Sequence, residues 1–291
     1  MGTPRADIEI DEGLIAALVA AQAPVLAGLP VRIVANGWDN VIARVGDGWM
    51  ARLPRRQVAV ELIVNELRWL PELAPRLPLP VPVAEVAGAP TEEFPYPFVI
   101  GRWLPGVAVS SVELADPAGT VTQLAAFVRA LHVPAPADAP ANPFRGVALQ
   151  QRADAVGERV ERLGSAIDGR RALAVWEDLC ATEPWAGPPL WLHGDLHPSN
   201  MLAVDGRVSA VIDFGDICAG DPATDLAMAW MMFDATGRAR FRDEAAIDPA
   251  TWRRAAGWAL NLALAYLTAD DTTSMPAIGR TTLTAVLADM A

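Results

Sequence analysis

Residues 192–200 read LHGDLHPSN, and residues 212–215 read IDFG. The first segment contains a His-x-Asp unit that ends at Asp195, and Asn200 follows five positions later. The second segment adds Asp213, directly before Phe-Gly. Apolar residues precede both polar segments, and we predict that these form short strands. This spacing beside two strands indicates a functional loop rather than two unrelated turns.

Phosphoryl transfer is the chemistry that explains such a grouping. An aspartate accepts the proton of an attacking hydroxyl, while an asparagine and a second aspartate hold the Mg²⁺ ions that neutralise nucleotide phosphates. Magnesium prefers oxygen ligands, which argues against His193 and His197 as metal ligands. The segment therefore predicts one catalytic aspartate and two oxygen ligands for metal.

Composition excludes several other classes of protein. The chain has 291 residues with a net charge of −12, which argues against a nucleic-acid partner or an anionic membrane surface and is compatible with a cationic ligand. All 23 basic residues are arginine. Without lysine, the chain has neither a Walker P-loop lysine nor a Schiff-base amine. We see no signal peptide and no apolar stretch long enough for a membrane span, so the sequence predicts a cytoplasmic protein.

The first hundred residues have the pattern of a small sheet with one inserted helix. We predict a short helix at 11–21, strands at 31–35, 41–45, 49–53, 83–86 and 96–101, and a helix at 57–73. The sequence Gly46-Asp47-Gly48 is typical of a tight hairpin between two of these strands. This part is therefore predicted to be a mostly antiparallel sheet.

The rest of the chain has mainly helical periodicity. We predict helices at 112–132 and 150–180, the second broken near Gly164 and Gly169, and further helices from 225 to the end. Two short strands, 190–193 and 210–212, are expected on either side of the polar loop. The predicted fold class is α+β, with a small antiparallel-sheet N-terminal lobe at 1–103 and a larger helical C-terminal lobe at 104–291.

The segments 193–200 and 212–215 resemble the aminoglycoside phosphotransferase family, which has a two-lobed, protein-kinase-like fold. Residues 220–227, GDPATDLA, strengthen the resemblance, which extends from about residue 31 to about residue 235. The resemblance implies that Asp195 is the catalytic base and that Asn200 and Asp213 are Mg²⁺ ligands. It also implies that Asp225 is structural and hydrogen-bonds the catalytic loop.

The same resemblance implies that the N-terminal lobe binds ATP, with GTP as an alternative. Arg52 stands on the third strand, where kinases carry a lysine that pairs with phosphates and with a helix glutamate. Of two candidate glutamates, Glu66 interrupts an apolar helix face while Glu61 lies on a polar one. We therefore expect Arg52 to pair with Glu66. Backbone groups near Arg102 and Leu104 would bind the adenine.

Acceptor binding leaves the fewest signals in the sequence. Asp154, Glu158 and Glu161 share one helical face, and acids of this lobe bind the amino groups of the antibiotic in aminoglycoside kinases. A solvated face is the alternative, because Glu158 can pair with Arg162 on the same helix. Asp234 and two aspartates at 270–271 are further acids of the same half.

These features favour a kinase that uses ATP and Mg²⁺ to phosphorylate a hydroxyl of an aminoglycoside-type antibiotic, a small cationic acceptor. Two alternatives stay open. One is a kinase of the same fold acting on a macrolide or on a metabolite such as choline or a sugar. The other is a non-catalytic nucleotide-binding module of kinase shape, against which the intact Asp195, Asn200 and Asp213 argue.

Overall fold

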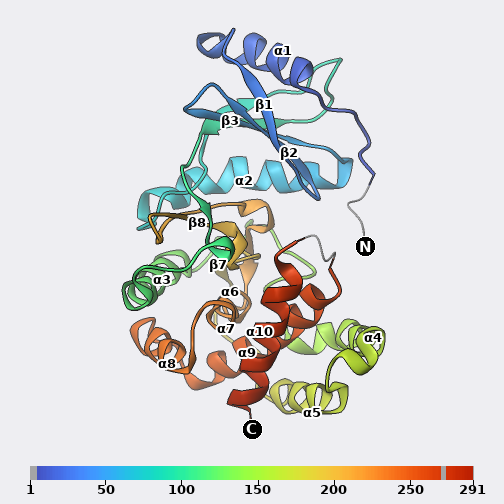
Figure 1. The fold of residues 1–291 in the computed structure, drawn as a ribbon, viewed down its shortest axis with the longest axis vertical. Helices are drawn as coiled ribbons and strands as arrows, with labels where there is room; N and C mark the ends of the chain where they lie inside the picture. Colours follow the sequence, from blue (N-terminus) through green and yellow to red (C-terminus); the bar gives the residue numbers. More distant parts are fainter. Residues whose placement is uncertain (1–4, 270–272, 291) are drawn as a thin grey trace.

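The computed structural model describes residues 5–269 and 273–290, and these form a small sheet-bearing lobe stacked on a larger helical lobe (Figure 1). The small lobe holds the helices α1 (Glu12–Gln22) and α2 (Val60–Leu73) and the first five strands. Strand β5 ends at Arg102, and β6, which pairs with β8 in the larger lobe, begins at Val107. The predicted boundary at 103/104 falls within this connection.

The small lobe is built on a five-stranded antiparallel sheet in the order β1-β2-β3-β5-β4. Its strands are β1 (Val31–Asn36), β2 (Asn40–Val45), β3 (Trp49–Pro54), β4 (Ala84–Gly88) and β5 (Phe98–Arg102). In β2, buried and half-buried residues alternate strictly, because successive side chains of a strand point to opposite faces. Val41, Ala43 and Val45 pack in the core under α1. The opposite face of the sheet is left for α2.

Helix α2 joins the two lobes through its buried face. Ile63 packs against Met50 and Val99 of the sheet, whereas Trp69 and Leu73 belong to the core of the helical lobe. Figure 1 shows α2 lying between the sheet and the helices below it. Because α2 has one apolar face, it can cover the sheet of the small lobe and the core of the larger lobe only where the two lobes meet. Groups from both lobes therefore come together beside α2.

The larger lobe is mainly helical. Its helices are α3 (Pro117–Leu131), α4 (Ala153–Leu163), α5 (Gly169–Cys180), α6 (Ala223–Leu226), α7 (Met228–Met232), α8 (Ala235–Glu244), α9 (Pro249–Leu267) and α10 (Met275–Asp289). The break predicted near Gly164 and Gly169 is present. The helix predicted to begin at 112 begins instead at Pro117, because Asp116 accepts a hydrogen bond from Gly119 N and caps it.

Short strands frame the polar loop, although not as the sequence suggested. β7 (Leu190–Leu192) pairs with β10 (Cys218–Gly220), while β9 (Arg207–Val211) pairs with β8 (Met201–Val204), which in turn pairs with β6 (Val107–Ala108). The strands before and after the loop thus belong to two different small sheets. The strands predicted at 190–193 and 210–212 correspond to β7 and to the end of β9, whereas β6, β8 and β10 were not predicted. Strands of two to five residues carry too little periodicity for their bounds and partners to be predicted from sequence.

Within residues 5–269 and 273–290, no helix is both long enough and apolar enough to cross a membrane.

Candidate active site

The polar loop is held in place by the buried carboxylate of Asp225. Its oxygens accept hydrogen bonds from the backbone N–H groups of His193 (2.8 Å) and Gly194 (2.9 Å). His132 Nε2 lies 3.1 Å from the same carboxylate. Gly194 has a φ of +85°, and a Cβ there would stand 2.3 Å from the carbonyl oxygen of Asp216, so only glycine fits this turn. The loop backbone is therefore fixed before any ligand arrives.

Replacing Asp225 by asparagine is expected to destabilise the fold. An amide offers one oxygen where the carboxylate offers two, so a buried N–H of the loop faces another donor. Each buried group left unpaired costs about 1–3 kcal/mol. Urea unfolding of Asp225→Asn should give a lower midpoint than wild type. Asp234→Asn is the matched control, because Asp234 caps α8 and asparagine caps a helix equally well. An unchanged midpoint for Asp225→Asn would contradict this role.

Asp195 lies at the centre of a set of hydrogen-bond donors. Its Oδ2 is 3.2 Å from His197 Nε2 and 3.3 Å from Asn200 Nδ2, and its Oδ1 is 3.2 Å from Arg145 Nη2. The carboxylate is 26% exposed, so one side of it is open to a ligand. Burial acts to raise the pKa of Asp195, but His197 and Arg145 together hold it below its ordinary value. The group is therefore a carboxylate at neutral pH.

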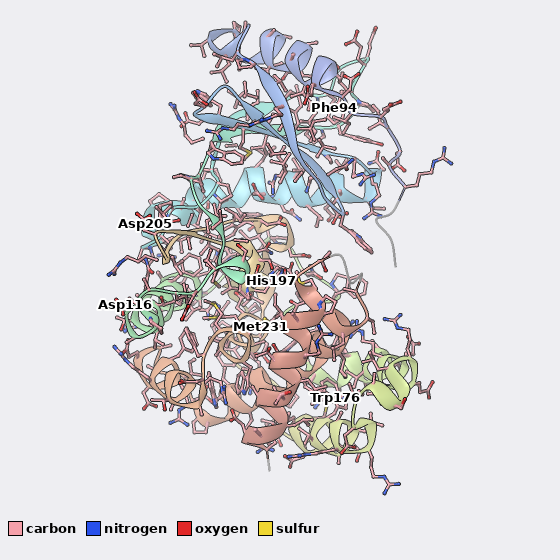
Figure 2. All side chains as sticks on the ribbon, in the orientation of Figure 1. Phe94, Asp116, Trp176, His197, Asp205 and Met231 are labelled. Carbon is pink, nitrogen blue, oxygen red and sulfur yellow. The ribbon has the colours of Figure 1, made fainter. Side chains whose placement is uncertain are left out.

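The two loop histidines are fixed by hydrogen bonds that determine which ring nitrogen carries the proton. His193 accepts from Asp195 N at Nδ1 (3.2 Å) and donates from Nε2 to the carbonyl of Ile212 (2.9 Å). His197 accepts from Ser199 N at Nδ1 (3.2 Å), which leaves its Nε2–H for Asp195. His193 thus ties the two polar segments together. His197, which Figure 2 shows near the junction of the lobes, orients the Asp195 carboxylate.

Asn200 and Asp213 provide the oxygen atoms that a hard cation requires. Asn200 directs its Nδ2 to Asp195, and no donor from residues 5–269 or 273–290 binds its Oδ1. Asp213 is 54% exposed at its side chain and adopts a left-handed backbone (φ +65°), which is uncommon for a residue other than glycine. Within the described ranges, no three Asp, Glu, His or Cys residues could hold a metal together. The pair fits Mg²⁺ whose remaining ligands are phosphate and water.

Arg52 and Glu66 form a buried ion pair. Arg52 is 5% exposed and Glu66 is 2% exposed, and their side chains are in direct contact. Arg52 pairs in register with Ile42 on β2, so it points away from α1 and toward α2, where Glu66 stands. Burial acts to lower the pKa of Arg52, but the Glu66 carboxylate raises it above the ordinary value. Arg52 Nη1 also lies 3.6 Å from Asp213 Oδ1, which links the sheet to the polar loop.

The residues predicted for adenine lie at the end of β5. The side chain of Arg102 stacks on the Trp49 ring at 3.8 Å and pairs with Glu85, so it points outward. Leu104, by contrast, makes no backbone hydrogen bond to the described residues. Its free N–H and carbonyl suit the backbone role expected at this position.

Arg145 is a residue of the site that the sequence analysis missed. The segment that carries it is locked by Gly146, whose N–H donates to Thr224 Oγ1 (2.9 Å) and whose carbonyl accepts from Asp221 N (2.9 Å). Asp221 is itself buried in an ion pair with Arg254. Arg145 lies in a proline- and alanine-rich connection with no periodicity, and only its contact with Asp195 reveals it.

The three acids predicted for acceptor binding lie on the solvent side of α4. Asp154, Glu158 and Glu161 are all exposed, whereas Val156 and Val160 of the same helix are buried. On a helix these acids are turned about half a revolution away from the valines. The geometry gives no support to acceptor binding by these acids. Asp234 caps α8, and residues 270–271 lie outside the described ranges.

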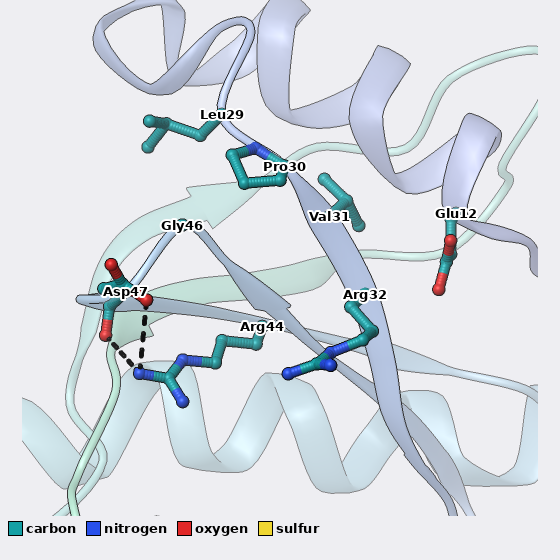
Figure 3. A pocket seen from close by; sticks show the side chains of 8 residues that line it. All are labelled: Glu12, Leu29, Pro30, Val31, Arg32, Arg44, Gly46 and Asp47. Carbon is teal, nitrogen blue, oxygen red and sulfur yellow. Dashed lines mark hydrogen bonds and ion pairs between the residues drawn. The ribbon is translucent and has the colours of Figure 1, made fainter.

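A hollow on the small lobe is separate from this site. It has a volume of about 520 Å³ and lies at the outer edge of the β1–β2 hairpin (Figure 3). Arg44 on its wall is turned to Asp47, which it contacts through the carbonyl at 3.0 Å. None of the residues of the polar loop lines this hollow.

A sheet lobe over a helical lobe, with Asp195, Asn200 and Asp213 at their junction, defines a protein-kinase-like fold. The chain belongs to the phosphotransferase enzyme family, whose model matches residues 30–258. The family resemblance and the fold class that the sequence predicted are thereby confirmed.

Individual relatives agree with this membership. A 121-residue stretch is 33% identical to an aminoglycoside 3'-phosphotransferase of Escherichia coli, and covers 38% of this chain and 42% of that protein. The fold is similar to that of the GDP complex of aminoglycoside 2'-phosphotransferase-IIIa, with a TM-score of 0.70 and 19% identity over 97% of this chain and 100% of that one. It is also similar to the macrolide 2'-phosphotransferase MphH of Brachybacterium faecium, with a TM-score of 0.62 and 22% identity over 94% and 97% of the two chains.

Proposed function

We propose that this chain transfers the γ-phosphoryl group of ATP or GTP to a hydroxyl of a small molecule in a Mg²⁺-dependent reaction. The observation that carries the proposal is the convergence of Asp195, Asn200 and Asp213 at the junction of the lobes, with Arg52 within 3.6 Å of Asp213. Phosphoryl transfer requires positioning and charge stabilisation more than covalent chemistry, and these are the roles such residues can fill.

Asp195 orients the acceptor hydroxyl and takes its proton as the oxygen attacks the phosphorus in line with the leaving oxygen. His197 and Arg145 keep the carboxylate ionised and fixed in direction. Asn200 Oδ1 and Asp213 would hold Mg²⁺, which, when bound, neutralises the charge of the phosphates. Arg52, held by Glu66, binds phosphate oxygens, and its buried Nε has no hydrogen-bond partner in the described part of the chain. The backbone of Arg102 and Leu104 binds the base.

The names of the relatives support two different classes of acceptor. The names of the relatives support an aminoglycoside-type acceptor, and the name of one solved structure supports a macrolide. The acids that would bind an aminocyclitol face away from the buried side of α4. The proposed function is therefore transfer to a hydroxyl group, and an acceptor panel identifies the compound that carries it.

An acceptor panel tests the proposed function. ADP or GDP release is measured with each nucleotide and Mg²⁺, against kanamycin, a macrolide, choline and neutral, acidic and phosphorylated sugars. We expect release above the acceptor-free rate for at least one hydroxyl compound, and loss of that release when EDTA removes the metal. Nucleotide binding without release for any acceptor would overturn the proposal in favour of a non-catalytic module.

A further inference from the structure

Three arginines gather on the acceptor side of the catalytic loop. Arg145 contacts Asp195, Arg152 ends the one-turn helix η5 (Leu149–Arg152), and Arg159 lies two turns further along on α4. They are close enough to repel one another: burial and then Arg145 lower the pKa of Arg152, and burial, Arg152 and Arg145 lower that of Arg159. Three guanidinium groups therefore lie near one another beside Asp195, where the carboxylates of Asp195 and Asp216 face Arg145.

Two of these charges have no carboxylate partner. Arg145 pairs with Asp195 and also lies near the Asp216 carboxylate, but Arg152 forms no ion pair with any described residue and lies over the Phe144 ring at 5.4 Å. Among the described residues, Arg159 hydrogen-bonds only the neutral Asn261, through Oδ1 at 2.7 Å and the backbone carbonyl at 3.4 Å. The Nε–H groups of Arg145 and Arg152 are buried and have no hydrogen-bond partner within residues 5–269 and 273–290. Unpaired buried donors are costly, and a ligand can satisfy them.

A purely structural role explains only part of this cluster. Arg159 ties α4 to α9 through Asn261, so its position has a structural reason. Arg152 has no such anchor. The chain carries a net charge of −12 and has acids on the same helix, yet these acids lie on the opposite, exposed face. Among the described residues, Arg152 and Arg159 therefore add positive charge on this side that no carboxylate pairs, in a protein that is acidic as a whole.

We propose that the acceptor carries an anionic group, a carboxylate or a phosphate monoester, which Arg152 and Arg159 bind while its hydroxyl faces Asp195. Guanidinium groups bind both kinds of oxyanion through paired N–H donors. The proposal rests on the proposed phosphotransfer function and replaces the cationic acceptor that the family resemblance suggested. A polycationic aminoglycoside would meet repulsion here instead of attraction.

The test compares sugars that differ only in charge. Glucuronate, glucose 6-phosphate, glucose and glucosamine are titrated by calorimetry into protein saturated with Mg²⁺ and ADP, so that the nucleotide site is filled. The buffer contains 0.15 M salt to screen long-range attraction. Wild type is compared with the double variant Arg152→Gln/Arg159→Gln. Arg170→Gln is the matched control, because Arg170 is exposed on the neighbouring helix α5 and has no partner among the described residues.

We expect wild type to bind glucuronate, glucose 6-phosphate or both about tenfold more tightly than glucose and glucosamine. The double variant should lose that preference while Arg170→Gln keeps it, and both should bind Mg²⁺-ADP as wild type does. The arm that responds distinguishes a carboxylate from a phosphate. Equal binding of all four sugars, no measurable binding of either anion, or a preference that survives in the double variant would overturn the proposal. Failure of Mg²⁺-ADP binding would instead count against the proposed function.

Discussion

Replacing Asp195 by asparagine is expected to lower kcat for phosphotransfer by about 100- to 10,000-fold, the usual contribution of a positioned general base. Asparagine keeps the shape and the contact with Arg145 but cannot take a proton. It also loses the negative charge that balances Arg145. Nucleotide affinity should change little, because the carboxylate faces the acceptor side of the loop. The measurement is ADP release with the best acceptor, together with nucleotide titration of the same variant.

Asp205→Asn is the matched control for this substitution. Asp205 stands in the exposed turn between β8 and β9, and Figure 2 shows it on the flank of the larger lobe, away from His197. Its φ of +50° is one that asparagine tolerates well. The control should therefore retain full kcat. If Asp195→Asn kept more than about a tenth of the wild-type kcat, a general-base contribution of the usual size would be absent.

Some residues of the site could be predicted from the sequence, and others could not. Asp195, Asn200 and Asp213 lie within a short stretch, and their chemistry fixes their spacing, so the pattern is visible without a structure. Glu66 was recognisable because a carboxylate on an apolar helix face needs a partner. Arg145 gave no signal, since a tertiary contact alone brings it to Asp195.

On helix α4, the sequence could not decide which charged residues face the interior. Its acids recur at helical spacing, and so do Arg152, just before the helix, and Arg159 on it, so the spacing of charged residues alone assigns neither group to the interior. Only the position of Val156 and Val160 against the rest of the lobe decides which face is turned inward. The strand β7 was predicted, but its partner β10 was not, because their pairing joins segments nearly thirty residues apart. Tertiary arrangement, and not local propensity, determines these features.

The second large effect is expected from Arg52→Ala, which leaves the Glu66 carboxylate buried without its partner. Breaking a buried ion pair in this way costs about 3–5 kcal/mol of folding free energy. Nucleotide affinity should fall as well, by about 10- to 100-fold, if Arg52 donates charged hydrogen bonds to phosphate. Urea unfolding and nucleotide titration measure the two effects. Arg254→Ala, which breaks the buried pair with Asp221, should cost stability but leave the nucleotide affinity of the folded protein unchanged.

A double variant separates the structural from the functional role of Arg52. In Arg52→Met with Glu66→Leu, both charges are replaced by apolar side chains, and such replacements of buried pairs are often neutral or stabilising. The unfolding midpoint should therefore return toward wild type while nucleotide affinity stays low. A double variant that recovered both would show that Arg52 serves only to neutralise Glu66. If the double variant loses nucleotide affinity but keeps its stability, Arg52 itself contacts the phosphates. This chain has no lysine, so an arginine would then make the phosphate contact that a lysine makes in kinases.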